Sequence, residues 1–374
     1  MNYSVPIPLE DELAAGMLER FAQLNGISSG KQAIEFLKTN TTSNEEQPPI
    51  WLLAEACGID KNKFISRYSM LPVMYPISSY LGSSRESTQR RSIAYRGFIT
   101  SPTTFRWCME CSKLDLEERG FSHWRRRHQI VGIDWCIDHR IPLSQSPKTV
   151  TAHASVIDNE SLNILSVSPE EMNNPALLRL QDILYDWLQK HRPLRLQAWT
   201  QVIGERCRSL GLRIGEVGKR KVASDWIREQ FPKNWLSKHF PEISAKNPQA
   251  YVRKVDGACV DKHVSYPALA CAAILAVIYD SAKDALAALN EADNRISEGT
   301  QFKLPTDSAV LAFLAGEGLQ KACDSAGAKL SDVETHLRRM YLELGTASSM
   351  CIFAEAQETI VYGMLVVKSA EHYA

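Results

Sequence analysis

The sequence lacks the local motifs of the common phosphate-binding and metal-dependent hydrolytic enzymes. It contains no Gly-x-x-x-x-Gly-Lys-Ser/Thr loop, no Gly-x-Gly-x-x-Gly turn after a predicted strand and no His-Glu-x-x-His pair. Adjacent acids such as Glu117 and Glu118 are typical of a solvated surface. A two-metal nuclease needs carboxylates that converge from distant segments, which one sequence does not reveal. We therefore expect no enzymatic activity, and a hidden site of this kind is the open alternative.

The sequence also has few features that would direct the chain into or across a membrane. The amino terminus has no basic segment followed by an apolar one. The most apolar run, 268–279, is too short to span a bilayer and is followed by Asp280. Six cysteines lie singly and do not form the framework of a secreted protein: Cys57, Cys207, Cys259, Cys271, Cys323 and Cys351. These absences predict a cytoplasmic protein in a reducing compartment, without a membrane partner.

The chain has no net charge, because 43 Lys and Arg are balanced by 43 Asp and Glu. This balance argues against a protein that coats nucleic acid non-specifically, although it leaves room for a local basic face. A hydrophobic content of 44% is that of a globular protein, and 374 residues suffice for two or three compact units.

Two closely spaced pairs of metal-ligating residues stand out against this background. Cys108 and Cys111 form one C-x-x-C pair, and Cys136 and His139 form a C-x-x-H pair about two dozen residues later. Three thiolates and one imidazole are a complete tetrahedral set for Zn²⁺, and a site with four protein ligands is structural rather than catalytic. The alternative is that these are unrelated buried cysteines. His123 and His128 are competing ligands, and we expect His128 to hydrogen-bond inside the metal-centred core.

The residues around these pairs resemble the signature of the TniQ/TnsD family. They are Cys108, Cys111, Trp124, Arg125, His128, Gln129, Gly132, Cys136, His139 and Leu143. The opening segment 6–13 also resembles the start of that family's domain, and the resemblance covers about the first 145 residues. Met109 stands where the family usually has Pro. Many members carry a second zinc ribbon, but here no Cys pair follows Leu143, so a second metal is not expected.

The resemblance implies an adaptor that selects the target site in DNA transposition. Such proteins recruit the AAA+ ATPase TnsC, which in turn brings the transposase. One branch recognises attachment-site DNA directly, and the branch found in CRISPR-associated transposons rides, often as a homodimer, on the RNA-guided Cascade complex. The zero net charge favours the Cascade-bound form, because direct readers usually need a strong basic face. The alternatives are a TnsD-like direct DNA binder and a stand-alone zinc-containing DNA-binding regulator.

Periodicity predicts a mainly α fold in three parts. These are a helical, helix-turn-helix-like region at 1–75, a zinc-ribbon or finger module at 76–145 and a helical C-terminal domain at 146–374. Helices are expected at 9–24, with Glu10, Asp11 and Glu12 in the first turn, and on both sides of Gly58. The Ser-, Pro- and Asn-rich stretch 144–175 is expected to be the boundary between the two halves. A second helix-turn-helix-like unit is expected at 308–344, turning at Gly327, whereas the last 25 residues fit either a helix or a strand pair.

Several basic residues are candidates for contact with nucleic acid or an acidic partner surface. They are Arg90, Arg91, Arg125, Arg126, Arg127, Lys219, Arg220, Lys221, Arg338 and Arg339. For Arg125, Arg126 and Arg127, the binding role predicts that reversal to Glu leaves the fold intact. The alternative is that the arginines are solvated or paired with Asp115, Glu117 and Glu118.

Overall fold

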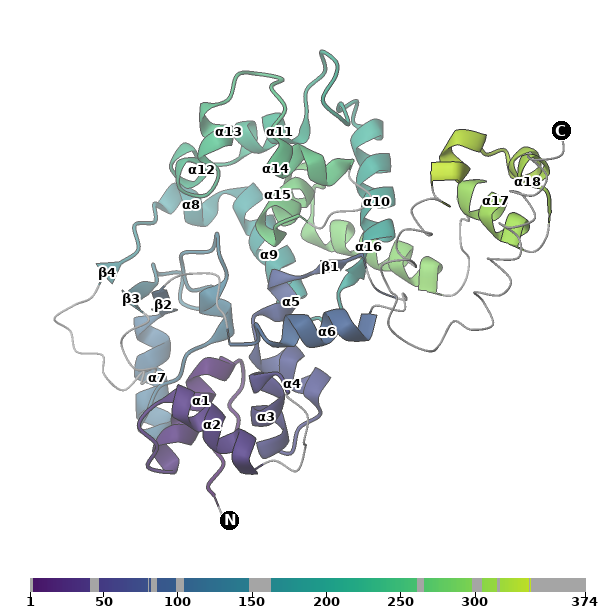
Figure 1. The fold of residues 1–374 in the computed structure, drawn as a ribbon. Helices are drawn as coiled ribbons and strands as arrows, with labels where there is room; N and C mark the ends of the chain where they lie inside the picture. The colour runs from purple at the N-terminus through teal and green to yellow at the C-terminus, as the bar shows by residue number, and fades with distance from the viewer. Residues whose placement is uncertain are drawn as a thin grey trace. The chain divides into compact units, whose positions relative to one another are not determined.

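The computed structural model describes residues 3–40, 47–79, 81, 86–98, 104–147, 163–260, 266–297, 305–314, 317–335 and 337. The chain divides into two compact units, Met1–Asn294 and Arg295–Ala374 (Figure 1). The mainly helical fold class is confirmed. The division into 1–75, 76–145 and 146–374 stays a prediction.

The N-terminal part of the first unit is helical. Its helices are α1 (Ala14–Leu24), α2 (Gly30–Asn40), α3 (Pro49–Ala56), α4 (Lys61–Tyr68) and α5 (Leu71–Met74). Gly58 has a left-handed φ of 66° after α3, and the Asp60 side chain accepts from the backbone N–H groups of Asn62 and Lys63 at the start of α4. The two helices flanking Gly58 are therefore present as predicted. DNA reading by α4 stays a prediction.

The expected position of the first three acids was wrong. Helix α1 begins at Ala14, after the acids, and Asp11 has a left-handed φ of 55°. Residues 11–13 instead run beside residues 124–126: Leu13 N–H donates to Trp124 O at 2.7 Å and Arg126 N–H donates to Asp11 O at 2.8 Å. This backbone pairing attaches the start of the chain to the segment between the two Cys pairs.

A small sheet underlies the metal-ligating segment. The elements here are β1 (Ile77–Ser78), α6 (Glu86–Ala94), β2 (Thr104–Trp107), α7 (Met109–Arg119), the 3-10 turn η1 (Arg126–Gln129), β3 (Ser144–Pro147) and β4 (Asn163–Ile164). Strands β2, β3 and β4 pair antiparallel in that order, with Trp107 opposite Ser144. The described part of 144–175 thus supplies strands to this sheet, and also α8 (Pro169–Asn173).

The rest of the first unit is a helical body. It comprises α9 (Pro175–Gln189), β5 (Leu194–Arg195), which pairs with β1, α10 (Leu196–Ser209), α11 (Ala223–Gln230), α12 (Lys233–His239), α13 (Pro241–Ala245), α14 (Arg253–Asp256), η3 (Gly257–Cys259), α15 (Ala268–Ile278) and α16 (Ala282–Ser297). Helix α15 is buried at every position from Ala270 to Ile278, because α9, α10, α11 and α14 pack around it (Figure 1). A helix that is apolar on all sides needs such enclosure.

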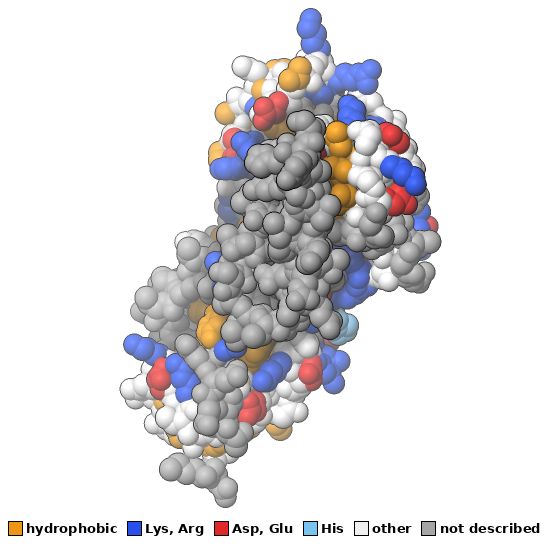
Figure 2. Space-filling view, turned by 45° about the vertical axis from the view of Figure 1, so that its right-hand side comes forward, with side chains coloured by type: hydrophobic (Ala, Val, Ile, Leu, Met, Phe, Trp, Pro, Cys, Tyr) orange, Lys and Arg blue, Asp and Glu red, His pale blue; other side chains and the backbone are white. Residues whose placement is uncertain are grey.

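Helix α15 has only 11 residues. Among the described helices, none combines the length and the apolar character needed to cross a membrane. On the face drawn in Figure 2, acidic and basic side chains are interspersed over the lower part of the described surface.

The second unit contains α17 (Pro305–Leu314) and α18 (Leu319–Ala326), followed by helical residues at 330–335. Gly327 ends α18 with a left-handed φ of 65°. Ala309 and Val310 of α17 pack with Cys323 of α18 and with Val333. The predicted turn at Gly327 is thus present, and two helices precede it. Arg338, Arg339 and the last 25 residues lie outside the described residues.

Candidate metal centre

Local structure brings the two pairs of ligating residues face to face. Cys108 follows β2 and is the N-cap of α7, whose first turn carries Cys111. Cys136 and His139 lie in a tight turn that is closed by Arg140 N–H donating to Cys136 O at 2.9 Å. Because β2 pairs with β3, the two segments are held side by side.

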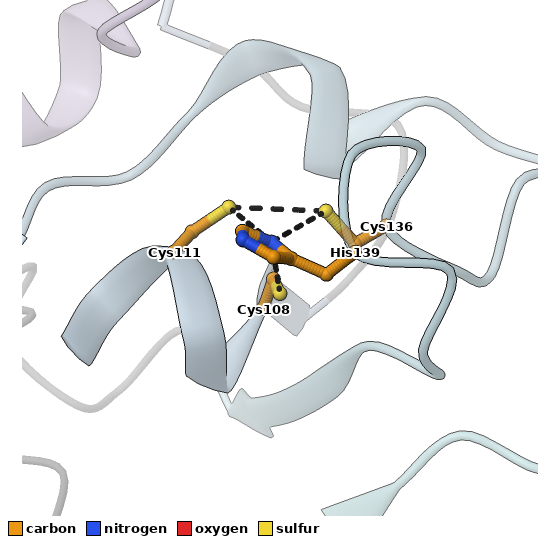
Figure 3. A group of neighbouring side chains, drawn as sticks. All are labelled: Cys108, Cys111, Cys136 and His139. Carbon is orange, nitrogen blue, oxygen red and sulfur yellow. Dashed lines mark hydrogen bonds between the residues drawn. The ribbon is translucent and has the colours of Figure 1, made fainter. Parts of the chain in front are cut away.

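The four side chains point toward one common centre (Figure 3). His139 Nδ1 lies 3.4 Å from the sulfurs of Cys108 and Cys111 and 3.6 Å from that of Cys136, and the last two sulfurs are 3.8 Å apart. All four ligand atoms lie within 4.8 Å of one another. A zinc ion with ordinary bond lengths and tetrahedral angles separates two sulfurs by about 3.8 Å and sulfur from nitrogen by about 3.6 Å. The four predicted ligands thus have the spacing of one tetrahedral site.

The chemistry of the group also fits a cation. The three cysteines are buried and His139 is half-buried. Hydrogen bonds with Cys108 and Cys136, together with burial, hold the pKa of the Cys111 thiol far above its ordinary value. Three buried thiolates repel one another unless a positive ion lies among them. This cluster can therefore hold one metal ion.

The two competing histidines have other roles. His128 is buried, and its Nε2 lies 3.8 Å from Cys111 Sγ, so it contacts the ligand group from outside, as expected. His123 Nε2 lies 3.2 Å from Glu10 O, and its Nδ1 lies 3.3 Å from Asp115. Neither residue belongs to the four-ligand group.

Signature residues between the Cys pairs stabilise the segments that carry the four ligands, which we call the ligand loops (residues 108–111 and 132–140). Gln129 joins η1 to β2 by two hydrogen bonds. Its side-chain oxygen accepts from Arg106 N–H at 3.1 Å, and its side-chain amide donates to Arg106 O at 2.7 Å. Arg106 is itself buried and pairs with Asp134 at 2.9 Å, and burial lowers the pKa of its guanidinium to about 10. Sequence reasoning missed Arg106 and Asp134, because their contact joins positions far apart in the chain.

The three consecutive arginines do not form an exposed basic face. Arg125 makes two hydrogen bonds to Asp115, at 2.6 and 2.8 Å. Arg127 pairs with Asp138 at 2.8 Å and with Asp11 at 3.3 Å. The alternative of ion pairing thus holds for Arg125, but the partners of Arg127 were not expected.

Arg126 is the clearest departure from the sequence-based expectation. Its side chain is only 2% exposed and pairs with Asp11. Its guanidinium donates to the backbone oxygens of Ser66, Ser69 and Leu188 at 2.8 to 3.3 Å. A guanidinium in this position joins three segments of the fold and is not accessible to a partner.

The other basic candidates lie on separate elements. Arg90 is exposed on α6 and pairs with Glu86, and Arg91 on the same helix is half-buried. Lys219, Arg220 and Lys221 are exposed on the loop between α10 and α11. Arg338 and Arg339 lie beyond the described residues. A binding role for the exposed residues stays a prediction.

One short segment has the letters of a hydrolase nucleophile elbow without its structure. Residues 26–30 read Gly-Ile-Ser-Ser-Gly, but they join α1 to α2, whereas an elbow needs a strand before the turn. Within the described chain this segment therefore has no support as a catalytic site.

The comparisons with known proteins agree with the local signature. A protein-family model described as TniQ matches residues 4–143, a range that contains all four ligand positions and the opening segment. No curated protein matches the chain.

Proposed function

We propose that this chain is a target-selection adaptor in DNA transposition, because a TniQ family model matches residues 4–143. Proteins of the TniQ family act in transposition-associated target-site selection and DNA binding without catalysis of their own, and the match supports the same role here. The observation that carries the proposal is the buried group of Cys108, Cys111, Cys136 and His139 at the centre of the matched segment.

We propose that the cation is a single structural Zn²⁺. Cys₃His is a donor set typical of structural zinc, and four protein ligands leave no position for a reacting water. When bound, the ion supplies folding energy and balances the thiolates. The chain's own residues position the metal-binding segment against the rest of the fold. The ligand loops are fixed to the helical body by Trp235 Nε1–H, which donates to Gly132 O at 2.9 Å, and by Trp135 Nε1–H, which donates to Gln181 at 2.8 Å.

We further propose that the adaptor docks on an RNA-guided Cascade complex and recruits TnsC and the transposase in the cytoplasm, as a homodimer. The zero net charge of the chain supports this form over a direct reader. The TnsD-like alternative, direct binding of attachment-site DNA, is favoured by a specific observation, the exposed basic loop between α10 and α11.

Co-purification tests the proposal. The tagged chain is co-expressed with the CRISPR-complex proteins and guide RNA, and separately with the TnsC-type ATPase, of the same locus. The expected result is stable association with both and lost DNA integration when the chain is omitted. Association with neither, combined with tight sequence-selective binding of the chain alone to DNA, would instead establish the direct reader.

A further inference from the structure

Positive charge is concentrated in one part of this electrically neutral chain. Between Arg206 and Asp256 there are twelve Lys or Arg and only five Asp or Glu. This range lies outside the family-matched segment and covers the end of α10, the loop to α11, and helices α11 to α14. Figure 2 shows Lys and Arg side chains projecting from the upper end of the described surface, where Figure 1 places α11 to α14.

Two of the five acids are buried and bonded to partners inside the fold. Asp225 and Asp256 are buried: Asp256 accepts from the backbone N–H and the hydroxyl of Ser224, at 2.8 and 2.7 Å, and Asp225 pairs with the buried Lys246 at 2.9 Å. Because these carboxylates face inward, they do not neutralise the surface.

The remaining charges leave the surface basic. Glu229 pairs with Lys221 at 2.7 Å and Glu242 pairs with Lys254 at 3.7 Å, so Glu216 is the one exposed acid of this range without an ion pair in the described structure. The exposed basic residues with no such pair in the described chain are Arg208, Lys219, Arg220, Arg228, Lys233 and Arg253, of which Arg228 donates a hydrogen bond to Lys246 O. Their charges are available to a partner.

Hydrogen bonds hold the loop between α10 and α11 in a defined conformation. Its base is closed by Arg213 N–H donating to Lys221 O at 2.8 Å. The Arg213 guanidinium donates to Gly218 O within the loop and to Gln249 O of a neighbouring segment. Gly218 has φ 131°, and a Cβ there would lie 2.9 Å from Arg213 Cδ, so the shape requires glycine. Val217, 93% exposed, is beside the two free cations Lys219 and Arg220.

We propose that residues 213–221, together with the exposed Lys233 of α12 and Arg253 of α14, bind the phosphodiester backbone of a nucleic acid. Spaced cations on several elements suit a regular row of phosphates, whereas a stable protein interface needs a dry apolar core. Val217 is the one exposed large hydrophobic residue of this range in the described structure, which is too little for such a core. The choice of nucleic acid over an acidic protein also rests on the proposed function.

This surface belongs to the same compact unit as the metal centre. Helix α12, which carries Lys233, also carries Trp235 and Lys238, whose side chains contact Gly132 O and Asp134 of the ligand loops. A backbone bound at the basic surface would therefore be held in a fixed place relative to the family-matched segment.

Salt-dependent binding of the metal-loaded full chain tests the inference. Fluorescence anisotropy with a labelled 20-bp DNA duplex of arbitrary sequence, and with an RNA duplex of the same length, is measured at several KCl concentrations. The double variant Lys219→Glu, Arg220→Glu should lose at least about ten-fold in affinity, and the slope of log K against log salt should become shallower by about 2. The matched control, Lys31→Glu with Lys283→Glu, makes the same charge change at exposed positions elsewhere and should bind like the unaltered protein.

The outcomes separate this inference from the proposed function. No binding by the unaltered protein at low salt, or equal loss in the control variant, overturns the basic surface. Unchanged DNA and RNA binding with lost association to a protein partner also overturns it, because the loop would then contact protein. Lost nucleic-acid binding with unimpaired transposition supports the surface and argues against direct reading of target DNA by this chain. A preference for DNA or RNA identifies the source of the phosphates.

Discussion

At the scale of single residues, the decisive feature is that charged side chains near the metal centre are buried and paired with one another. Arg126 would be taken for a surface residue from its place in an Arg-Arg-Arg run, but its guanidinium is buried among backbone oxygens. Asp11, its partner, lies 115 positions earlier in the chain. The run therefore contributes to stability through buried pairs, which are costly to break because the remaining charge stays desolvated.

Arg126→Ala should lower the free energy of unfolding by about 3–5 kcal/mol, since it leaves three backbone oxygens without this donor and removes one of the two arginines that pair with the carboxylate of Asp11. Urea denaturation followed by circular dichroism measures the difference. Arg90→Ala, which removes an exposed i,i+4 partner of Glu86, is the control and should cost less than about 0.5 kcal/mol. Equal stability of the two variants would show that the buried contacts of Arg126 contribute nothing. The sequence predicted that reversal of all three arginines to Glu spares the fold. Because Arg126 is buried, we now expect this reversal to destabilise the protein.

Asp115 should give the protein a pH-dependent contribution to stability. Burial alone would raise the pKa of Asp115, but hydrogen bonds from His123 and Arg125 hold it well below its ordinary value. A depressed folded-state pKa stabilises the protein at pH values above the unfolded Asp pKa, about 3.9, and the contribution is lost as pH falls below it. The stability difference between the native chain and Asp115→Asn should therefore shrink between pH 6 and pH 3. A difference that stays constant over this range in denaturant titrations would exclude the effect.

At the scale of elements, the joint between the metal-ligand loops and the helical body depends on one glycine. Gly132 has φ 90°, and a Cβ at this position would lie 2.5 Å from Leu269 Cδ1. Its carbonyl is also the acceptor for the Trp235 indole. A side chain at this position would therefore have to adopt a left-handed φ and would also displace the side chain of Leu269 at the start of α15.

Gly132→Ala should cost about 2–3 kcal/mol, because backbone strain and a steric clash act together. Gly58→Ala is the matched control: its φ is 66°, but a Cβ there would meet nothing within 4 Å, so only the conformational cost of about 1 kcal/mol is expected. Thermal melts of the two variants measure the comparison. If Gly58→Ala is the more damaging of the two, the close approach at Gly132 is not important for stability.

At the scale of the whole molecule, the metal centre is integrated into the unit Met1–Asn294. The segment between the two Cys pairs contacts the start of the chain, where residues 11–13 pair with residues 124–126. Just before Cys136, Trp135 contacts α9 and Gly132 contacts Trp235 of α12. Loss of the cation should therefore weaken the unit as a whole and not only the loops around it.

Cys108→Ser, or removal of the ion by a chelator, should lower the free energy of unfolding by more than about 2 kcal/mol, because metal binding is coupled to folding. Far-UV circular dichroism, which reports the distant helices, should show the same downward shift of Tm as tryptophan fluorescence. Metal analysis should find one zinc per native chain and less in the variant, with Cys57→Ser keeping its metal. Identical melting with and without chelator would contradict a structural ion.

The sequence by itself predicted the four-residue group that could hold a metal ion, the resemblance to TniQ proteins over the first part of the chain, and most helices. Each of these depends on short spacings: two C-x-x-C/H pairs, the signature around Trp124 and apolar residues at helical intervals. Local spacing is preserved whatever the rest of the chain does, so it can be read without a structure. The turns at Gly58 and Gly327 were predictable for the same reason.

Only the tertiary structure decided what the charged residues do. Arg126 is buried because Ser66, Ser69 and Leu188 converge on it, and the surface from 206 to 256 is basic because Asp225 and Asp256 turn inward. The stretch 144–175 looked like a linker, yet residues 144–147 form a strand because β2 lies beside them. The energy of a charge or an edge strand depends on partners that are distant in sequence, and folding alone brings those partners together.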